Sequence, residues 1–148
     1  MKQVTFYVMK SYYLSNSNLN TNTLLSHLSR KYWYQRKKVL VYCENKIQAI
    51  YIDDILWEQP LDAFIPHNII GEGPNSGAPI EIAWSQNEIN LTSYDILINL
   101  FFKFSNIFLN FKEIIDFAPY EEDYLKELAR VRYKEYRKFG FKLNIILL

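Results

Sequence analysis

Short apolar runs recur along the chain and are rich in β-branched and aromatic residues. They lie at residues 4–9, 39–43, 80–84, 95–100 and 112–117. Runs of this length and composition are typical of strands in a covered sheet. We therefore expect five strands.

Between these runs, apolar residues recur at helical spacing. Leu24, Leu25, Leu28 and Tyr32 predict a first helix, whose C-terminal part carries basic residues, as the helix dipole favours. A second helix is predicted from Ile47 to Trp57 and is stopped by Pro60. A short helical turn is predicted over Ser105–Leu109, and a last helix runs from Glu121 to a cap at Gly140.

The order strand–helix–strand–helix predicts a parallel sheet with right-handed crossovers. We therefore expect an α/β fold, a Rossmann-like three-layer domain with a mostly parallel central sheet flanked by helices. The sequence has no repeat and no linker, so we expect residues 1–148 to form a single domain.

Composition limits the classes of function that the chain can have. Seventeen basic and 16 acidic side chains give a net charge of +1, so the chain is not a bulk nucleic-acid binder. Cys43 is the only cysteine, which excludes an intrachain disulfide or a cysteine-built zinc site, and we expect it to be buried. The N-terminus lacks a signal-peptide pattern and residues 96–111 are too polar to cross a bilayer, so we expect a soluble, cytoplasmic protein without membrane contact.

The glycine-rich segment Gly71–Gly77 raises the alternative of a nucleotide-binding enzyme. Phosphate loops hand the phosphate to a helix N-terminus, whereas these glycines lead through Ala78 and Pro79 into a predicted strand. A connection between sheet elements is therefore favoured. His67 is more easily explained as a residue hydrogen-bonded to backbone than as a general base, and we expect no catalytic residue, cofactor or metal.

Two aromatic rings, Trp57 and Phe64, flank the bend marked by Pro60. Large rings serve equally well as core anchors or as the centre of a protein interface. The residues alone leave this choice open.

The C-terminal helix concentrates positive charge, with seven basic and two acidic residues between Lys126 and Lys142. A solvated charged face is the usual interpretation of such a helix. A tyrosine among cations also suits a short acidic peptide, and direct nucleic-acid binding is a further alternative that the near-neutral total disfavours. Helical spacing predicts two neighbouring faces on this helix. The inward face consists of Leu125, Leu128, Ala129, Arg132 and Tyr136. The basic face consists of Lys126, Arg130, Tyr133, Lys134 and Arg137.

With these residues in view, the chain resembles the chi subunit family of bacterial DNA polymerase III nearly end to end. Two dense blocks carry the resemblance: Leu56–Pro60, Phe64–Pro74 and Ala78–Trp84, then Asp116–Glu121, Leu128–Arg137 and Gly140–Phe141. Ser11–Asn22 carries no family signature, and the tail Ile145–Leu148 is unusually apolar.

The resemblance implies a non-catalytic replication adaptor that touches DNA only indirectly. Chi proteins pair with the psi subunit, which tethers them to the clamp loader, and bind the acidic C-terminal tail of single-stranded DNA-binding protein. Family positions assign tail binding to Lys126, Arg130, Tyr133 and Lys134. They assign psi binding to Trp57 and Phe64, a surface that can also engage a helicase-like repair protein.

Overall fold

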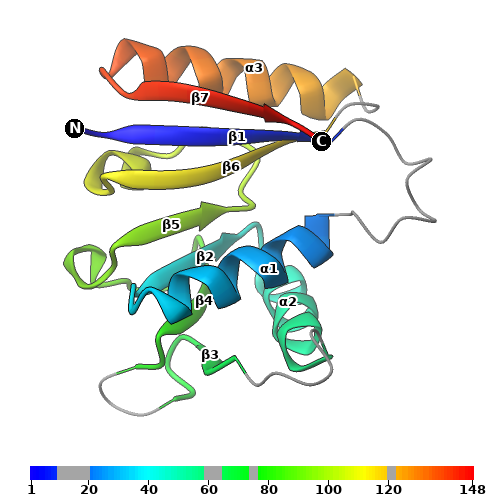
Figure 1. Cartoon of the computed structure of the whole chain (residues 1–148), viewed down its shortest axis with the longest axis vertical. Helices are drawn as coiled ribbons and strands as arrows, with labels where there is room; N and C mark the ends of the chain where they lie inside the picture. Colours follow the sequence, from blue (N-terminus) through cyan, green and yellow to red (C-terminus); the bar gives the residue numbers. More distant parts are fainter. Residues whose placement is uncertain (10–20, 59–64, 74–76, 120–122) are drawn as a thin grey trace.

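The computed structural model describes residues 1–9, 21–58, 65–73, 77–119 and 123–148. Its centre is a seven-stranded sheet in the order β3-β4-β2-β5-β6-β1-β7, and every strand pair is parallel (Figure 1). The strands are β1 (Gln3–Met9), β2 (Val39–Cys43), β3 (His67–Ile69), β4 (Ile80–Trp84), β5 (Ile96–Asn99), β6 (Glu113–Pro119) and β7 (Lys142–Leu147).

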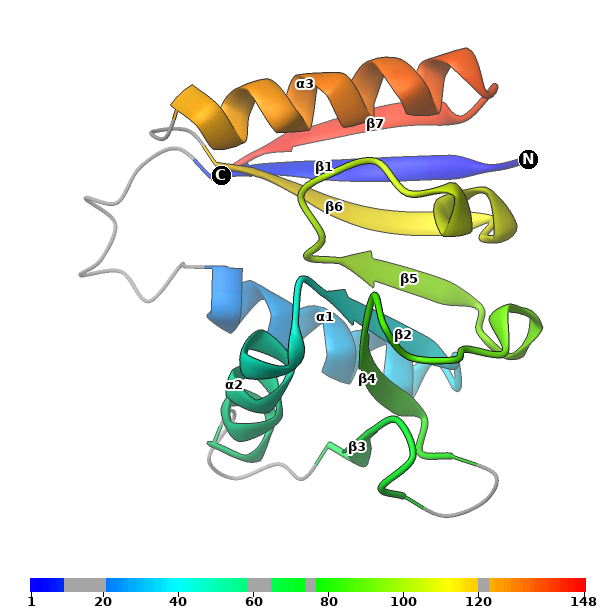
Figure 2. The same ribbon diagram turned by 180° about the vertical axis from the view of Figure 1, so that it is seen from behind.

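Helices cover both faces of the sheet and complete three layers. Helices α1 (Thr21–Tyr34) and α2 (Lys46–Glu58) lie on one face, and α3 (Asp123–Lys138) lies on the other, over β6, β1 and β7. Figure 2 shows the α3 face, where short 3-10 turns at Leu91–Ser93 and Asn106–Asn110 also lie. The predicted α/β class and parallel sheet are confirmed.

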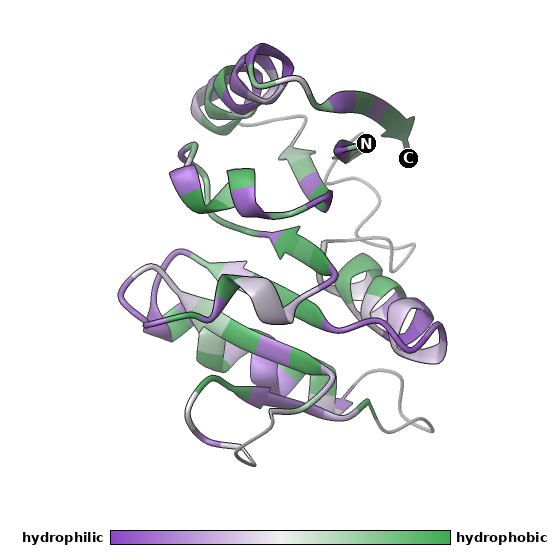
Figure 3. Cartoon of the chain, turned by 90° about the vertical axis from the view of Figure 1, so that its left-hand side faces the viewer, coloured by the Kyte–Doolittle hydropathy of each residue, from purple (hydrophilic) through white to green (hydrophobic). Residues whose placement is uncertain are grey.

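The central strands are mostly apolar, as expected for strands that are covered on both faces. All five residues of β2 are buried, and so are all four of β5. Figure 3 shows these strands coloured as hydrophobic, whereas α3 carries hydrophilic residues over much of its surface. Two apolar clusters fill the layers, one under α1 and α2 and one under α3.

The helix ends follow capping rules. Asn45 precedes α2, and its side-chain Oδ1 accepts a hydrogen bond from the backbone N–H of Gln48 at 2.9 Å. Helix α3 ends at Lys138 and is capped by Gly140, which has a φ of 86°. Phe141 N–H donates to the Tyr136 carbonyl at 3.0 Å, and Gly140 N–H donates to the Arg137 carbonyl at 3.1 Å. These are the two bonds of a Schellman motif, so the predicted cap is confirmed.

Two strands were not predicted. Strand β3 has only three residues, too few for a periodic signal. Strand β7 is an edge strand whose residues pair with β1, from Gln3 opposite Lys142 to Val8 opposite Leu147. It includes three residues of the apolar tail, Ile145, Ile146 and Leu147, whose exposed fractions are 54%, 39% and 65%.

Candidate partner-binding surfaces

A small cavity lies between helix α3 and the carboxyl ends of β1 and β6. Its volume is about 180 Å³. Its floor is apolar and its rim carries two cations; the lining residues are Phe6, Val8, Ala118, Pro119, Lys126, Ala129, Arg130, Tyr133 and Ile145.

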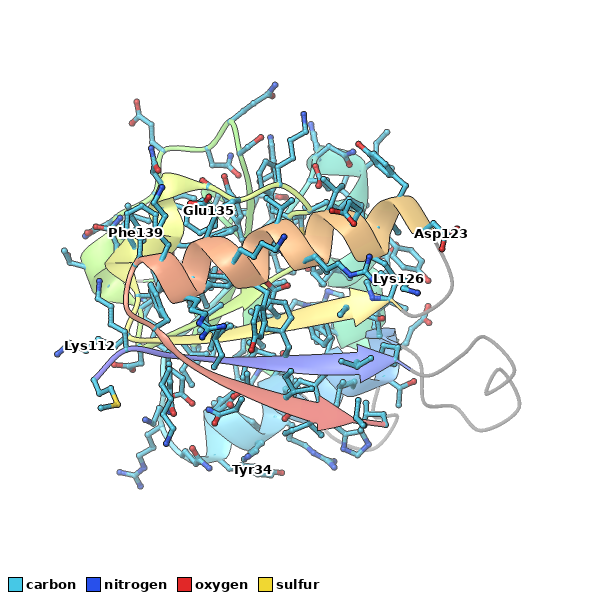
Figure 4. The ribbon with its side chains drawn as sticks, turned by 90° about the horizontal axis from the view of Figure 1, so that it is seen from above. Tyr34, Lys112, Asp123, Lys126, Glu135 and Phe139 are labelled. Atoms are coloured by element: carbon cyan, nitrogen blue, oxygen red, sulfur yellow. The ribbon has the colours of Figure 1, made fainter. Side chains whose placement is uncertain are left out.

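Three of the four residues predicted to bind the partner tail line this cavity. Lys126, Arg130 and Tyr133 are spaced four and three positions apart on α3, which places them on one face of the helix. Lys134 is exposed on the same helix but does not line the cavity. Figure 4 shows Lys126 near the start of α3, beside the tips of the strand arrows.

Ring packing positions Tyr133 at the cavity, and an ion pair positions Arg130. The Tyr133 ring packs against Phe6, with ring centroids 5.8 Å apart and planes inclined by 51°. Arg130 Nη1 donates a 3.2 Å hydrogen bond to Glu127 Oε2, and the side chains of the pair are 64% and 61% exposed. Exposed pairs of this kind contribute little to stability, so Arg130 can exchange Glu127 for another carboxylate.

Arg132 belongs to the core. It is 2% exposed, and its guanidinium donates to both Asp116 carboxylate oxygens, from Nε at 3.0 Å and from Nη2 at 3.1 Å. It also donates to the backbone carbonyls of Phe102 and Phe117. Tyr136 donates its hydroxyl to the same carboxylate at 2.9 Å, and burial, followed by the charge of Asp116, raises the pKa of Tyr136 well above its ordinary value.

This buried pair was missed by sequence reasoning, although Arg132 was placed on the inward face. One of the seven basic residues between Lys126 and Lys142 is therefore internal and neutralised. The signal that could have revealed it was a guanidinium on an apolar helix face, because an arginine there needs a buried acid.

The second predicted surface lies on α2. Trp57 is 58% exposed, which rules out the core-anchor reading for this ring. Its ring packs edge-to-face with the buried His67 ring, with centroids 4.9 Å apart. Phe64 lies outside the described residues.

Beside Trp57 a broader cavity of about 550 Å³ is lined in part by Asp53, His67 and Glu72. His67 Nδ1 lies 2.7 Å from the Ile65 carbonyl oxygen, which confirms the predicted backbone bond, and its Nε2 lies 3.2 Å from Asp53 Oδ1. Burial raises the pKa of the Asp53 carboxyl, His67 opposes that shift, and the nearby Glu72 adds to it.

The glycine segment connects β3 to β4, as predicted for a link between sheet elements. A Cβ on Gly73 would lie 2.4 Å from the Asn68 side chain, and one on Gly77 would lie 2.6 Å from Glu81. These glycines admit close side-chain packing, and β4 follows them where a phosphate loop would have a helix.

Cys43 is fully buried, as predicted, and burial raises the pKa of its thiol to about 12. Among the residues with described positions, no three His, Cys, Asp or Glu side chains are grouped to hold a metal ion. Within the same described segments, no helix is long and apolar enough to span a membrane.

Comparison with known proteins gives one consistent result. The family model described as DNA polymerase III chi subunit, HolC, matches residues 1–144. The DNA polymerase III subunit chi of Escherichia coli is 43% identical over 144 residues, covering 97% of each chain. That of Haemophilus influenzae is 38% identical over 143 residues, covering 97% of this chain and 95% of the relative. The same subunit of Pseudomonas aeruginosa is 29% identical over 144 residues, again covering 97% and 95%. The chain therefore belongs to the chi subunit family of DNA polymerase III, an accessory subunit of the replication machinery.

Proposed function

We propose that the chain is a non-catalytic adaptor that binds the acidic C-terminal tail of single-stranded DNA-binding protein in the α3 cavity. A second surface, at Trp57 and Phe64, binds the psi subunit and through it the clamp loader. The α3 cavity carries the proposal, because it combines an apolar floor with a cationic rim in one small site.

The cavity suits a tail that ends in an aromatic residue preceded by acids. A protein cavity of about 150 Å³ accepts benzene, so about 180 Å³ is enough for one phenyl ring. Tyr133 and Phe6 would contact the ring, and Arg130 would bind the terminal carboxylate in bidentate fashion.

Lys126 would offset the aspartates that precede the terminal residue, and Lys134 would add attraction from outside the cavity. Ordering a short tail costs conformational entropy, so one tail binds modestly. Several tails on one oligomer would raise the effective affinity by avidity.

Calorimetric titration with a peptide ending in Asp-Phe tests the site. Arg130→Ala should weaken binding by about 1.5–3 kcal/mol, the range for a hydrogen bond to a charged group. Glu127→Gln should strengthen binding a few-fold, because it removes the carboxylate that pairs with Arg130 in the free protein.

Arg137→Ala is the matched control, because Arg137 is an exposed arginine on the same helix that does not line the cavity. It should change affinity only slightly and in a salt-dependent way. Equal losses for Arg130→Ala and Arg137→Ala would contradict a specific cavity and favour diffuse charge attraction.

A further inference from the structure

A third surface, at the end of α1, combines cations with exposed rings. Five basic residues and no acid occur between Arg30 and Lys38, although the whole chain has a net charge of +1. Three of the five, Arg36–Lys38, lie beyond the last helical residue Tyr34, so they are not explained by the dipole of the helix's last turn alone.

Arg36 occupies a backbone position that favours glycine. Its φ is 60°, and it is the only non-glycine residue with positive φ among the described residues. Its backbone N–H donates to the Trp33 carbonyl at 2.8 Å, and the backbone N–H of Lys37 donates to the Tyr32 carbonyl at 3.0 Å.

These two bonds form the same motif that ends α3, where Gly140 takes the equivalent place. An arginine in the left-handed region costs conformational energy that glycine would not. A strained backbone at a non-glycine residue points to a role for its side chain beyond closing the helix.

The strained arginine borders a cavity. About 380 Å³ of space lies between the end of α1 and residues 77–79, and its wall includes Trp33, Arg36, Lys37 and Lys38. Trp33 stacks on Tyr34 with centroids 5.2 Å apart and planes inclined by 26°. Tyr34 is 67% exposed, and in Figure 4 it lies at the border of the molecule, away from α3.

The nearby acids leave this surface positive. Glu81 lies 3.8 Å from Lys38 Nζ, and Asp95 accepts the backbone N–H of Lys38 at 2.8 Å. Neither Arg36 nor Lys37 is within ion-pair distance of a carboxylate of any described residue.

We propose that this surface, which we call the α1 end, binds single-stranded nucleic acid. Arg36 and Lys37 contact the phosphates, and Tyr34, supported by Trp33, stacks on an unpaired base. Phosphate contacts and ring stacking are the two elements of single-strand recognition that does not read sequence. A duplex hides the faces of its bases and could use only the cations. The proposal does not depend on tail binding, because the two sites are separate. The α3 cavity lies at the carboxyl ends of β1 and β6, whereas the α1 end lies where β2 and β4 begin.

Fluorescence anisotropy of the full chain with labelled 20-nucleotide oligo(dT) and oligo(U) tests the proposal. Binding should saturate at low salt and weaken as salt rises. Arg36→Gly should weaken it and flatten the slope of log K against log salt by about 0.7, the value for one phosphate contact on a single strand. Tyr34→Ala should weaken it by roughly fivefold or more, which is the loss of one stacked base. Tighter binding of one oligonucleotide would identify the natural strand as DNA or RNA.

Arg36→Gly should fold well, because glycine suits this backbone position, and its melting temperature should equal or exceed that of the wild type. Arg137→Ala on α3 removes the same kind of charge elsewhere and should bind oligonucleotides like the wild type. Absence of saturable binding at low salt would overturn the proposal. It would also be overturned if both Arg36→Gly and Tyr34→Ala bound oligonucleotides with wild-type affinity. An affinity loss in Arg137→Ala as large as that in Arg36→Gly, or binding of duplex DNA as tight as that of single strands, would overturn it as well.

Discussion

Two arginines two positions apart on α3 have opposite environments. Arg130 is exposed and shares one hydrogen bond with Glu127, whereas Arg132 is buried and donates to the Asp116 carboxylate and two backbone carbonyls. A buried charge is tolerated only when its donors are satisfied, and Arg132 meets that condition. The same residue type is therefore exposed on the cavity rim at one position and fixes the helix to the sheet at the other.

Replacing Arg132 with methionine should destabilise the protein by about 3–5 kcal/mol, because the buried Asp116 side chain would lose its charged partner. Arg130→Met makes the same chemical change at an exposed pair and should change stability by less than about 1 kcal/mol. Urea unfolding of both variants measures the difference. Similar losses would show that the buried pair does not anchor α3.

Cys43 should be inert in the folded protein, because burial raises the pKa of its thiol to about 12 and no thiolate forms at neutral pH. In the unfolded chain the thiol ionises near pH 8.5. The folded pKa is the higher one, so this contribution to stability is complete below about pH 8.5 and is lost as pH rises toward 12. The rate of labelling with a thiol reagent should follow the rate of unfolding, and rapid labelling of the native protein would contradict the burial.

At the scale of elements, the sequence predicted those whose signal is local. The run Val39–Cys43 and the helical spacing of α3 are strong patterns, and both elements form where expected. Strand β7 is specified by its pairing with β1 rather than by any alternation of its own, so only its apolar residues could be noticed. Three cavity residues followed from helical spacing together with family resemblance, while the floor from β1 and β6 depends on tertiary packing.

Helix C-termini offer a matched pair of substitutions. Gly140→Ala should destabilise the protein by roughly 1 kcal/mol, because alanine is strained at a φ of 86°. Arg36→Gly should leave the free energy of unfolding unchanged or raise it, although glycine adds flexibility to the unfolded chain. Thermal unfolding of both variants measures the signs. A destabilised Arg36→Gly would mean that the arginine side chain stabilises the fold itself.

At the scale of the molecule, the sheet separates the two proposed protein-binding surfaces. Trp57 lies on α2, which packs against β3 and β4 at one edge, and the α3 cavity includes Ile145 from β7 at the other. Six strand spacings of about 4.8 Å put the edges about 29 Å apart. That exceeds the Debye length of about 8 Å at physiological salt, so charges at one surface are screened from the other.

The two surfaces should therefore bind their partners independently. Trp57→Ala should abolish co-purification with psi, because it removes an exposed ring from the centre of that surface, while the affinity for a peptide ending in Asp-Phe stays unchanged. Arg130→Ala should show the reverse pattern. Calorimetry on the psi complex should give the same peptide affinity as the free chain, since distant sites without a shared partner contribute additively. A difference of more than about 0.5 kcal/mol would reveal coupling through the sheet, and loss of both interactions in Trp57→Ala would instead show that this ring supports the fold.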